Sequence, residues 1–507
     1  MANAQSAYEL LLTRLREVAL LRSTASLLSW DQEVLMPSRG VEHRGRQLAQ
    51  IAALAHEKLT DKRVAEWLND CESSRELTAD PTSVAAVNLR EIRRSHDQAI
   101  KVPESLVREF AETATLSKAQ WAAARQARDF AAFRPWLTKM VALSRRKAEC
   151  FGWAEDGEPW DALADDFEPK ITARQIEEVF VPLRDRLVAL NGQLLGVDST
   201  PPDCFQGRHL SEEAMRRFVE YVAKQFGFDF SRGRLDTSTH PFCAGFEPND
   251  VRMTTRFDEL NPIEPLFSTM HETGHGIYNQ GLPFEHHGTP MGESVSLGIH
   301  ESQSRLWENQ VGRSGAFWSW CAPRLREFFG AEADAVDARA VYASVNLVRP
   351  GFIRVEADEA TYNLHIMLRF ELERELMKGE LDCVDLPQAW NRKFESYLGI
   401  VPPDDAVGCL QDIHWSQGAF GYFPSYALGN LYASQLFARA EADLPELDRQ
   451  FERGQFGDLK AWLNENIHRE GMRYRAGTLC ERVTGEPLHA EPLLQHLERK
   501  LKPIYGL

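Results

Sequence analysis

The sequence predicts a mainly α-helical protein with one small β element. Apolar residues recur at helical spacing along most of the 507 residues, whereas strand-like runs are confined to residues 238–257. Hydrophobic residues make up 43% and charged residues 26% of the chain, which is ordinary for a globular protein. No repeat and no long linker rich in Pro, Gly or Ser marks a boundary. We therefore expect a single domain, 1–507, made of two lobes.

In the first third of the chain, the spacing of apolar residues predicts a series of helices. An apolar stripe at helical spacing ends before Pro37 and consists of Leu11, Leu15, Val18, Leu21, Ala25 and Leu28. Further helical patterns occupy residues 45–59, 103–127 and 133–153, and later in the chain residues 356–379 and 459–471. Stripes of this kind are typical core positions, so we assign these helices to the architecture alone.

The β element is predicted to be a hairpin. The segment STHPFCAGFEPNDVRMTTRF contains two short runs of aromatic and β-branched residues on either side of EPND. Pro, Asn and Asp between two such runs favour a turn. The hairpin directly precedes the most informative segment of the sequence.

Charge and cysteine usage exclude several classes of protein. Lys and Arg number 58 against 75 Asp and Glu, so the net charge is −17, which disfavours nucleic acid and anionic membranes as partners. No run approaches the roughly eighteen apolar residues of a membrane span, and the first residues do not resemble a signal peptide. The eight cysteines are scattered and form no C-x-x-C pair. We expect reduced thiols and a cytoplasmic protein.

One segment, LFSTMHETGHGIYNQGL, contains two histidines four positions apart. Asn261 and Pro262 supply a cap and a first-turn proline, and Gly281 supplies a stop, so the segment is predicted to be helical. Positions four apart differ by about 40° around a helix, so His271 and His275 project to the same side.

The residues of this predicted helix indicate a metal site with a general base beside it. Two imidazoles at this spacing can bind one Zn²⁺ or a similar ion. This geometry is the physical basis of the metal-binding pattern H-E-x-x-H. Glu272 lies about 100° further around the helix, where it can reach a water at the metal but is poorly placed as a ligand. Two unrelated histidines on a solvated face are the simpler alternative, and the helical context favours the metal site.

A catalytic zinc takes three protein ligands, and the third must come from elsewhere. A third histidine six residues after His275 would fall at Gly281, which excludes that arrangement. Two carboxylates remain: Glu293 in a Gly/Pro-rich segment predicted to be a loop, and Glu301 in a helical segment. A rigid helix modestly favours Glu301, and the neighbouring His300 is expected to touch the ligands at most indirectly.

At these residues the sequence resembles the carboxypeptidase Taq family of thermostable metallocarboxypeptidases. The resemblance is carried by MHETGHGIYNQG and GIHESQSRLWEN together with HPF at 240–242, DVRMT at 250–254, IRVEAD at 353–358 and GCLQDIHW at 408–415. It extends from SWDQEVLMP at 29–37 to the terminal YGL and shows no departure at the motif positions.

The resemblance implies His271, His275 and Glu301 as metal ligands and Glu272 as the general base. It also implies a mostly helical, neurolysin-like architecture in which an N-terminal helical lobe and a catalytic lobe enclose a deep groove. A homodimer is a further implication.

Other steps of peptide hydrolysis need further groups. His414, Tyr422 and Tyr426 in QDIHWSQGAFGYFPSY could stabilise the oxyanion, and we favour His414 and Tyr422. Arg354 and Arg252, which fall in motifs of the resemblance, are candidates for binding a terminal carboxylate, because a guanidinium matches its planar geometry. His240 could limit how far a peptide extends past the metal.

The sequence therefore predicts a metal-dependent carboxypeptidase that removes single residues from peptides with a free C-terminus. One divalent ion is expected, Zn²⁺ first, with Co²⁺ or Mn²⁺ compatible with the same ligands. An endo-acting metallo-oligopeptidase is the nearest alternative, and a catalytically silent metal-containing binding protein is the alternative from another class. An aminopeptidase is less favoured, because no G-x-M-E-N segment is present.

Overall fold

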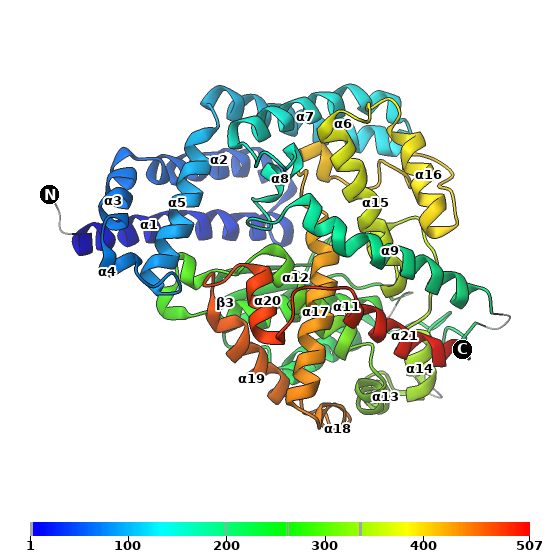
Figure 1. The fold of residues 1–507 in the computed structure, drawn as a ribbon. Helices are drawn as coiled ribbons and strands as arrows, with labels where there is room; N and C mark the ends of the chain where they lie inside the picture. The colour runs from blue at the N-terminus through cyan, green and yellow to red at the C-terminus, as the bar shows by residue number, and fades with distance from the viewer. Residues whose placement is uncertain (1–3, 198–199, 260, 262, 334–336) are drawn as a thin grey trace.

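Long helices form the first third of the chain, as predicted. The computed structural model describes residues 4–197, 200–259, 261, 263–333 and 337–507 (Figure 1). The apolar stripe before Pro37 lies on the first helix, where Leu11 and Val18 are buried. The helices of this region are α1 (Ala4–Val34), α2 (Val41–Leu59), α3 (Lys62–Glu72), α4 (Arg75–Thr78), α5 (Val84–Lys101), α6 (Glu104–Ala127), α7 (Phe130–Phe151), α8 (Pro159–Ala164) and α9 (Ala173–Leu195).

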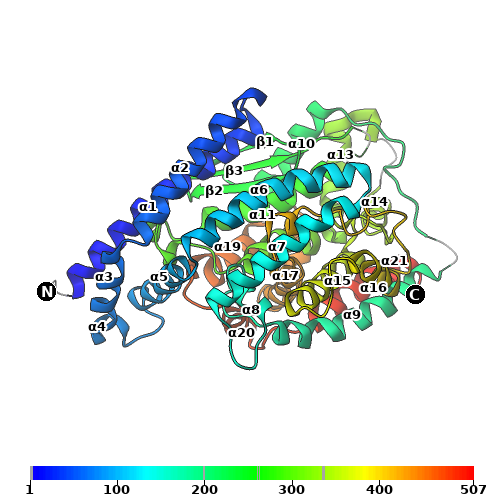
Figure 2. The same cartoon turned by 90° about the horizontal axis from the view of Figure 1, so that it is seen from above.

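The predicted hairpin is present as β2 (Phe242–Glu247) and β3 (Asp250–Thr255), which pair antiparallel. A third strand, β1 (Gly233–Thr237), pairs parallel with β3 and gives the order β1-β3-β2. The sequence did not predict β1, because its GRLDT run buries only Leu235 and has no apolar alternation. Figure 2 shows the sheet beside α1, which contacts β2.

The second half of the chain is again helical. Asp358 accepts hydrogen bonds from the first N–H groups of the predicted 356–379 helix, and Gly379 ends it in a left-handed conformation. The predicted 459–471 helix ends early, at Asn466. The helices are α10 (Glu212–Phe226), α11 (Glu264–Gly281), α12 (Leu297–Arg305), α13 (Gly315–Phe329), α14 (Ala338–Ser344), α15 (Glu359–Lys378), α16 (Leu386–Leu398), α17 (Pro424–Asp443), α18 (Leu447–Phe451), α19 (Gly457–Asn466), α20 (Ala476–Thr484) and α21 (Glu491–Tyr505).

The helix with the two histidines, α11, begins at Glu264, two residues later than predicted. Ile263 occupies the cap position without a side-chain hydrogen bond, and Pro265 is the proline of the first turn. The Asn261 carbonyl oxygen accepts the Glu264 N–H at 3.2 Å, and the Asn261 N–H donates to the Asp258 carbonyl oxygen at 3.1 Å. Pro262, the proline predicted for the first turn, lies outside the described residues.

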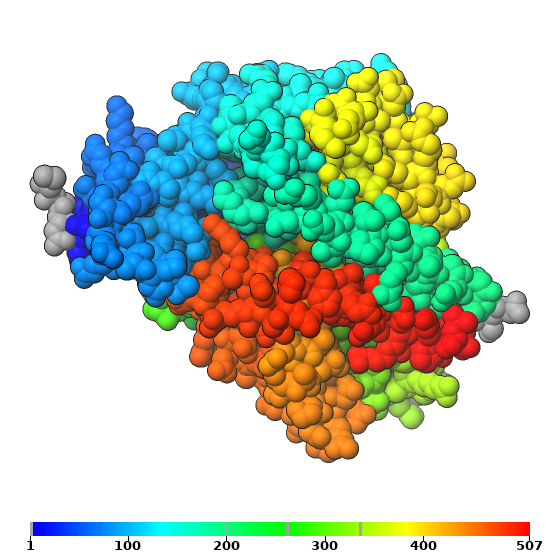
Figure 3. All heavy atoms as spheres, viewed as in Figure 1, coloured from blue at the N-terminus to red at the C-terminus, as the bar shows by residue number. Residues whose placement is uncertain are grey.

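The centre of the molecule is built from α12, α15 and α17. Most residues of these three helices are buried, because α17 packs against both α12 and α15 and α12 packs against α11. On the face drawn in Figure 3, the C-terminal helices, in red, lie along α9, in green. Within the described residues, no helix combines the length and apolarity needed to cross a bilayer.

Candidate metal centre

Gly274 sets how closely α11 approaches α12. A Cβ on this residue would lie 2.4 Å from the Gln303 carbonyl oxygen and 2.6 Å from the Ser304 Cα. Both are backbone atoms, so a larger residue would push α12 away. Because Gly274 stands between His271 and His275 in the sequence, this close approach brings α12 directly opposite the two histidines.

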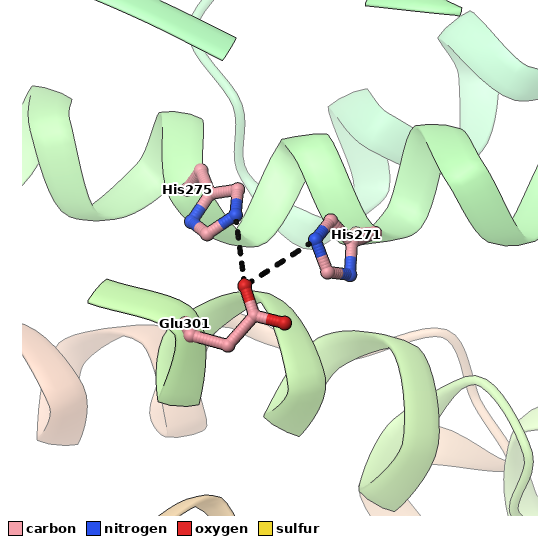
Figure 4. A group of neighbouring side chains, drawn as sticks. All are labelled: His271, His275 and Glu301. Atoms are coloured by element: carbon pink, nitrogen blue, oxygen red, sulfur yellow. Dashed lines mark ion pairs between the residues drawn. The ribbon is translucent and has the colours of Figure 1, made fainter. Parts of the chain in front are cut away.

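His271, His275 and Glu301 converge across this crossing (Figure 4). Their donor atoms lie within 4.8 Å of one another. Glu301 Oε2 is 3.6 Å from His271 Nε2 and 3.5 Å from His275 Nε2. Ligand atoms bound at about 2.0–2.1 Å to one tetrahedral ion stand about 3.3 Å apart, so these atoms already have nearly the spacing that one ion requires.

The other ring nitrogen of each histidine is engaged by the protein. His271 Nδ1 lies 2.8 Å from Glu308 Oε2, and His275 Nδ1 lies 3.1 Å from the His300 carbonyl oxygen. Both partners are acceptors, so each Nδ1 donates its proton and each Nε2 keeps a lone pair. Such bonds also fix the orientation of the rings.

Arg305 orients the carboxylate of Glu301. Its Nε donates to Glu301 Oε1 at 2.7 Å, and its Nη1 donates to Glu308 Oε2 at 3.1 Å. Burial alone would raise the pKa of both carboxyls, but Arg305 and His271 hold the pKa of Glu301 well below its usual range and lower that of Glu308 to about 2. Both groups are therefore ionised at neutral pH.

The charges of this donor set fit a divalent cation. Glu272, Glu301 and Glu308 are three buried carboxylates, whereas the guanidinium groups beside them belong to Arg305 and to Arg313, 3.7 Å from Glu308. A divalent ion would offset the remaining negative charge. Two histidines and a glutamate are also a common ligand set of catalytic zinc.

The structure brings Glu301, and not Glu293, to the histidines. Glu293 is exposed and follows the short helix η3 (Pro290–Gly292). Glu272 is buried on α11 next to His271 without joining the three converging donors. Burial raises the pKa of Glu272, and the two neighbouring histidines oppose this shift.

His414 and Tyr422 lie side by side before α17. His414 begins the short helix η7 (His414–Gln417), and its ring centroid is 5.2 Å from that of Tyr422. Burial lowers the pKa of His414 to about 4, so its ring is neutral at pH 7. Burial raises the pKa of Tyr422, and the charge of Glu301 adds to this shift.

Arg354 is buried beside this segment. Its Nε and Nη2 donate to Asp412 Oδ1 at 3.1 and 2.8 Å, and its Nη1 donates to the Tyr362 hydroxyl at 3.1 Å. Arg369 donates to the other carboxylate oxygen of Asp412 at 2.8 Å. Two guanidinium groups thus share one carboxylate, which leaves this buried cluster with excess positive charge.

Arg252 lies in the sheet that packs against α11, and His240 lies in the connection between β1 and β2. Arg252 on β3 donates two bonds to Asp250, at 2.8 and 2.9 Å, and its guanidinium lies 4.5 Å from the Trp30 ring centroid. His240 is exposed in the turn before β2, and its carbonyl oxygen accepts the Ser238 hydroxyl at 2.6 Å.

A comparison with known proteins identifies the family. The family model described as carboxypeptidase Taq (M32) metallopeptidase matches residues 10–501. The chain belongs to this family. Thermostable carboxypeptidase 1 of Thermus thermophilus is 45% identical to this carboxypeptidase over 509 residues, and the match covers 99% of each chain. Carboxypeptidase 1 of Bacillus subtilis is 35% identical over 494 residues, and that match covers 97% of each chain.

Solved structures agree with this membership. The M32 carboxypeptidase from Deinococcus radiodurans R1 matches with a TM-score of 0.95 at 39% identity, covering 99% of this chain and 100% of that one. Metallocarboxypeptidase 1 of Trypanosoma cruzi matches with a TM-score of 0.92 at 34% identity, covering 98% and 99%. The resemblance and the mainly helical fold predicted from the sequence are confirmed. The protein is a metal-dependent carboxypeptidase, a hydrolase of peptide bonds.

Two side chains at the candidate metal centre, Arg305 and Glu308, were not predicted from the sequence. They stand four and seven positions after Glu301, a spacing that places all three on one helical face and could have suggested them. The signal is weak because α12 continues as the π-helix η4 (Leu306–Val311), where side chains no longer follow α-helical spacing.

Proposed function

We propose that this carboxypeptidase removes single residues from the C-termini of peptides with an ion bound by His271, His275 and Glu301. The convergence of these three donors beside Glu272 is the observation that carries the proposal. Zn²⁺ is the proposed ion, and Co²⁺ or Mn²⁺ would suit the same ligands. When bound, a divalent ion in such a site lowers the pKa of a coordinated water to about 7 and polarises the scissile carbonyl.

Glu272 is the proposed general base. It follows His271 on α11, so its side chain starts about 100° around the helix from that ligand and stays beside the donors without joining them. Its carboxylate accepts the proton of the attacking water and then delivers it to the leaving amine. Proton transfer by a positioned group contributes roughly 10²–10⁴-fold to the rate.

His414 and Tyr422 are the proposed donors to the oxygen that becomes negative during the attack. His414 is neutral at pH 7, because burial lowers its pKa to about 4, so one ring nitrogen holds a proton to donate. Tyr422 keeps its hydroxyl proton, because burial raises its pKa. Fixed donors of this kind stabilise developing charge without reorganising.

Arg354 is the proposed contact for the terminal carboxylate of the substrate. The excess positive charge of Arg354 and Arg369 around Asp412 supports this role, because an arriving carboxylate would offset it. Arg252 is proposed as a second carboxylate contact. His240, exposed in the turn before β2, is proposed to limit the length of peptide beyond the scissile bond.

The proposed setting is a homodimer in the cytoplasm, with the site in a groove between two lobes. All eight cysteines carry free thiols, which supports a reducing compartment. Family membership supports the dimer and the groove. Sedimentation of the purified protein tests the dimer directly.

The activity is tested with two N-acetylated peptides of one sequence, one with a free C-terminus and one amidated. Each is incubated with the purified protein, with chelator, and after addition of Zn²⁺, Co²⁺ or Mn²⁺, and the products are identified by mass spectrometry. We expect stepwise loss of C-terminal residues from the free acid alone, abolished by chelator and restored by metal.

Internal cleavage of both peptides would overturn the proposed carboxylate contact and indicate an endo-acting oligopeptidase. Cleavage that persists in chelator would overturn the ligand set. A protein that cuts neither peptide with any of the three metals would be a binding protein.

A further inference from the structure

A segment from the first third of the chain holds the N-terminus of α12, the helix that carries Glu301. The Leu297 N–H donates to the Phe167 carbonyl oxygen at 3.1 Å, and the Gly298 N–H donates to Glu168 Oε1. The first N–H groups of a helix have no partner inside it, so external acceptors decide where the helix begins and how it is placed. Here two of those acceptors come from residues 167 and 168.

Glu168 and Gly298 fit each other closely. A Cβ on Gly298 would lie 2.8 Å from Glu168 Oε1, so a side chain there would displace the carboxylate. Glu168 is 2% exposed. Burial raises its pKa to about 7, and Ser296, Gly298 and Ser425 oppose the shift. Its neighbours are thus hydroxyl and backbone N–H groups of α12 and of the start of α17.

The flank of α12 is fixed by α17. A Cβ on Gly429 would lie 2.4 Å from Glu301 Cγ and 2.7 Å from Glu301 Cβ, so the side chain of Glu301 rests against the backbone of α17. With its N-terminus held by Glu168 and its flank held by α17, α12 has little freedom to rotate. The position of the Glu301 carboxylate follows from both contacts.

The same segment also touches the proposed oxyanion donor. The Phe167 ring packs edge-to-face on Tyr422, with centroids 5.1 Å apart and planes at 81°. Gly421 lies so close to Ala164 that a Cβ would come within 2.8 Å of the Ala164 backbone nitrogen. Residues 164–168 therefore connect the helix of the third ligand to the segment that carries Tyr422.

We propose that Glu168 is a positioning residue for the reaction, because its carboxylate oxygen accepts the Gly298 N–H and thereby places Glu301 opposite His271 and His275. The inference rests on the proposed function, since it takes Glu301 as the third ligand. Nothing in it requires Glu168 to touch the substrate. Its consequence is that metal affinity depends on a side chain outside the metal centre.

The test measures metal binding by the intact protein, without substrate. Glu168→Ala removes the acceptor, whereas Glu168→Gln keeps an acceptor oxygen and removes the charge. Asp161→Ala is the matched control, because Asp161 is a carboxylate of the same region that accepts the Ala173 N–H at the start of α9, at 2.6 Å, and α9 carries no proposed ligand. Zn²⁺ affinity is measured by competition with a chromophoric chelator, and the geometry of the site by the visible absorption spectrum of bound Co²⁺.

We expect Glu168→Ala to weaken Zn²⁺ binding by about ten- to a hundredfold and to change the Co²⁺ spectrum, as loss of an orienting partner does at metal sites. Glu168→Gln should restore binding to within about threefold of the unchanged protein, because the acceptor oxygen remains. Asp161→Ala should lower the melting temperature without changing either metal readout. Unchanged binding in a folded Glu168→Ala protein, or an equal loss in the control, would overturn the proposal.

Two further variants keep the result interpretable. If Glu168→Ala does not fold, Gly298→Ala probes the same contact from the other side, and unchanged Zn²⁺ binding there would sink the inference equally. Glu301→Ala reports separately on the proposed ligand set. If Glu301→Ala binds Zn²⁺ as tightly as the unchanged protein, the proposed function fails, whatever the Glu168 variants do.

Discussion

The hydrogen bond between His271 Nδ1 and Glu308 Oε2 decides which nitrogen of this histidine can bind a metal. At 2.8 Å from an ionised carboxylate, Nδ1 holds the proton, so the lone pair is on Nε2, which faces Glu301. The same role for His275 falls to the His300 carbonyl oxygen, which a side-chain substitution would not remove. Glu308 is thus the partner whose contribution can be measured.

We predict that Glu308→Ala weakens Zn²⁺ binding by about 10–100-fold, because the His271 ring loses its acceptor and Arg305 loses one of its two carboxylates. Glu308→Gln should bind with intermediate affinity, since an amide oxygen can still accept the Nδ1 proton. Chelator competition on the three proteins gives the order. If the alanine variant binds Zn²⁺ as tightly as the unchanged protein, the hydrogen bond does not orient the ring.

If Glu272 is the general base, its substitution should lower turnover without weakening metal binding. Glu272→Gln should lower kcat by about 10²–10⁴-fold or more, because the amide cannot accept a proton, while Zn²⁺ affinity stays within a few fold. His275→Ala is the contrasting variant and should lose both activity and metal. Steady-state kinetics on a free-acid peptide, with metal content measured on each sample, checks this. Substantial turnover by a metal-loaded Glu272→Gln protein would remove Glu272 from its role.

At the scale of elements, the proposed metal centre depends on helices that approach each other through glycines. Gly274 lies against the backbone of α12, and Gly429 of α17 lies against the side chain of Glu301 on the same helix. Helix α12 is therefore held by two close contacts, and Glu301, the proposed third ligand, lies next to the histidines of α11. The packing of three helices, more than any single bond, sets the distance between Glu301 and the histidines.

We predict that Gly429→Ala destabilises the fold by about 1–3 kcal/mol and also weakens metal binding, because the added methyl group would overlap Glu301 Cγ and Cβ. Gly192→Ala is the matched control on the helix α9. Its Cβ would meet nothing within 4 Å, so the substitution should raise the free energy of unfolding by about 0.5–1 kcal/mol. Chemical denaturation and Zn²⁺ competition measure the two effects. Metal affinity that is unaffected in Gly429→Ala would show that α17 does not position the ligand.

Elements with a strong local pattern were predictable from the sequence, and elements defined by distant partners were not. The apolar stripes of α1, α2, α6 and α7 and the turn between β2 and β3 are local signals. Strand β1 has no such signal, because it exists through parallel pairing with β3. The predicted start of α11 was wrong by two residues, because the expected side-chain cap is absent and Pro265 is the proline of the first turn.

The same distinction applies to the site. His271 and His275 were predictable from the sequence, because helical spacing alone brings them together. The choice of Glu301 over Glu293 needed the family resemblance. The role proposed for Glu168 could not be predicted from the sequence, because its contact with α12 joins residues 130 positions apart. Side chains that position the ligands from distant segments leave no spacing pattern in the sequence.

At the scale of the whole molecule, a buried carboxylate joins the first third of the chain to the last. Glu373 on α15 accepts the indole N–H of Trp160 at 3.0 Å, the indole N–H of Trp415 at 2.8 Å and the Gly421 N–H at 3.0 Å. Burial raises its pKa to about 7, and these three donors oppose the shift. Folding thus makes this group bind its proton more tightly than the unfolded chain does.

The sign of the resulting pH dependence follows from linkage. Between the unfolded value of 4.5 and the folded value of about 7, the folded state holds a proton that the unfolded state has released. The contribution of Glu373 to the free energy of unfolding therefore falls as the pH rises through this window and is constant above it. At about 1.4 kcal/mol per pKa unit, the fall is on the order of 3 kcal/mol.

We predict that Glu373→Gln flattens this dependence. The variant should be less stable than the unchanged protein at about pH 5, because its amide group must turn an N–H toward one of three donors, and the difference should shrink or reverse by about pH 8. Urea denaturation of both proteins in chelator, so that loss of metal at low pH does not contribute, measures the two curves. Parallel curves across this range would show that Glu373 keeps an ordinary pKa in the folded protein, and that its three donors hold it as a carboxylate rather than as an acid.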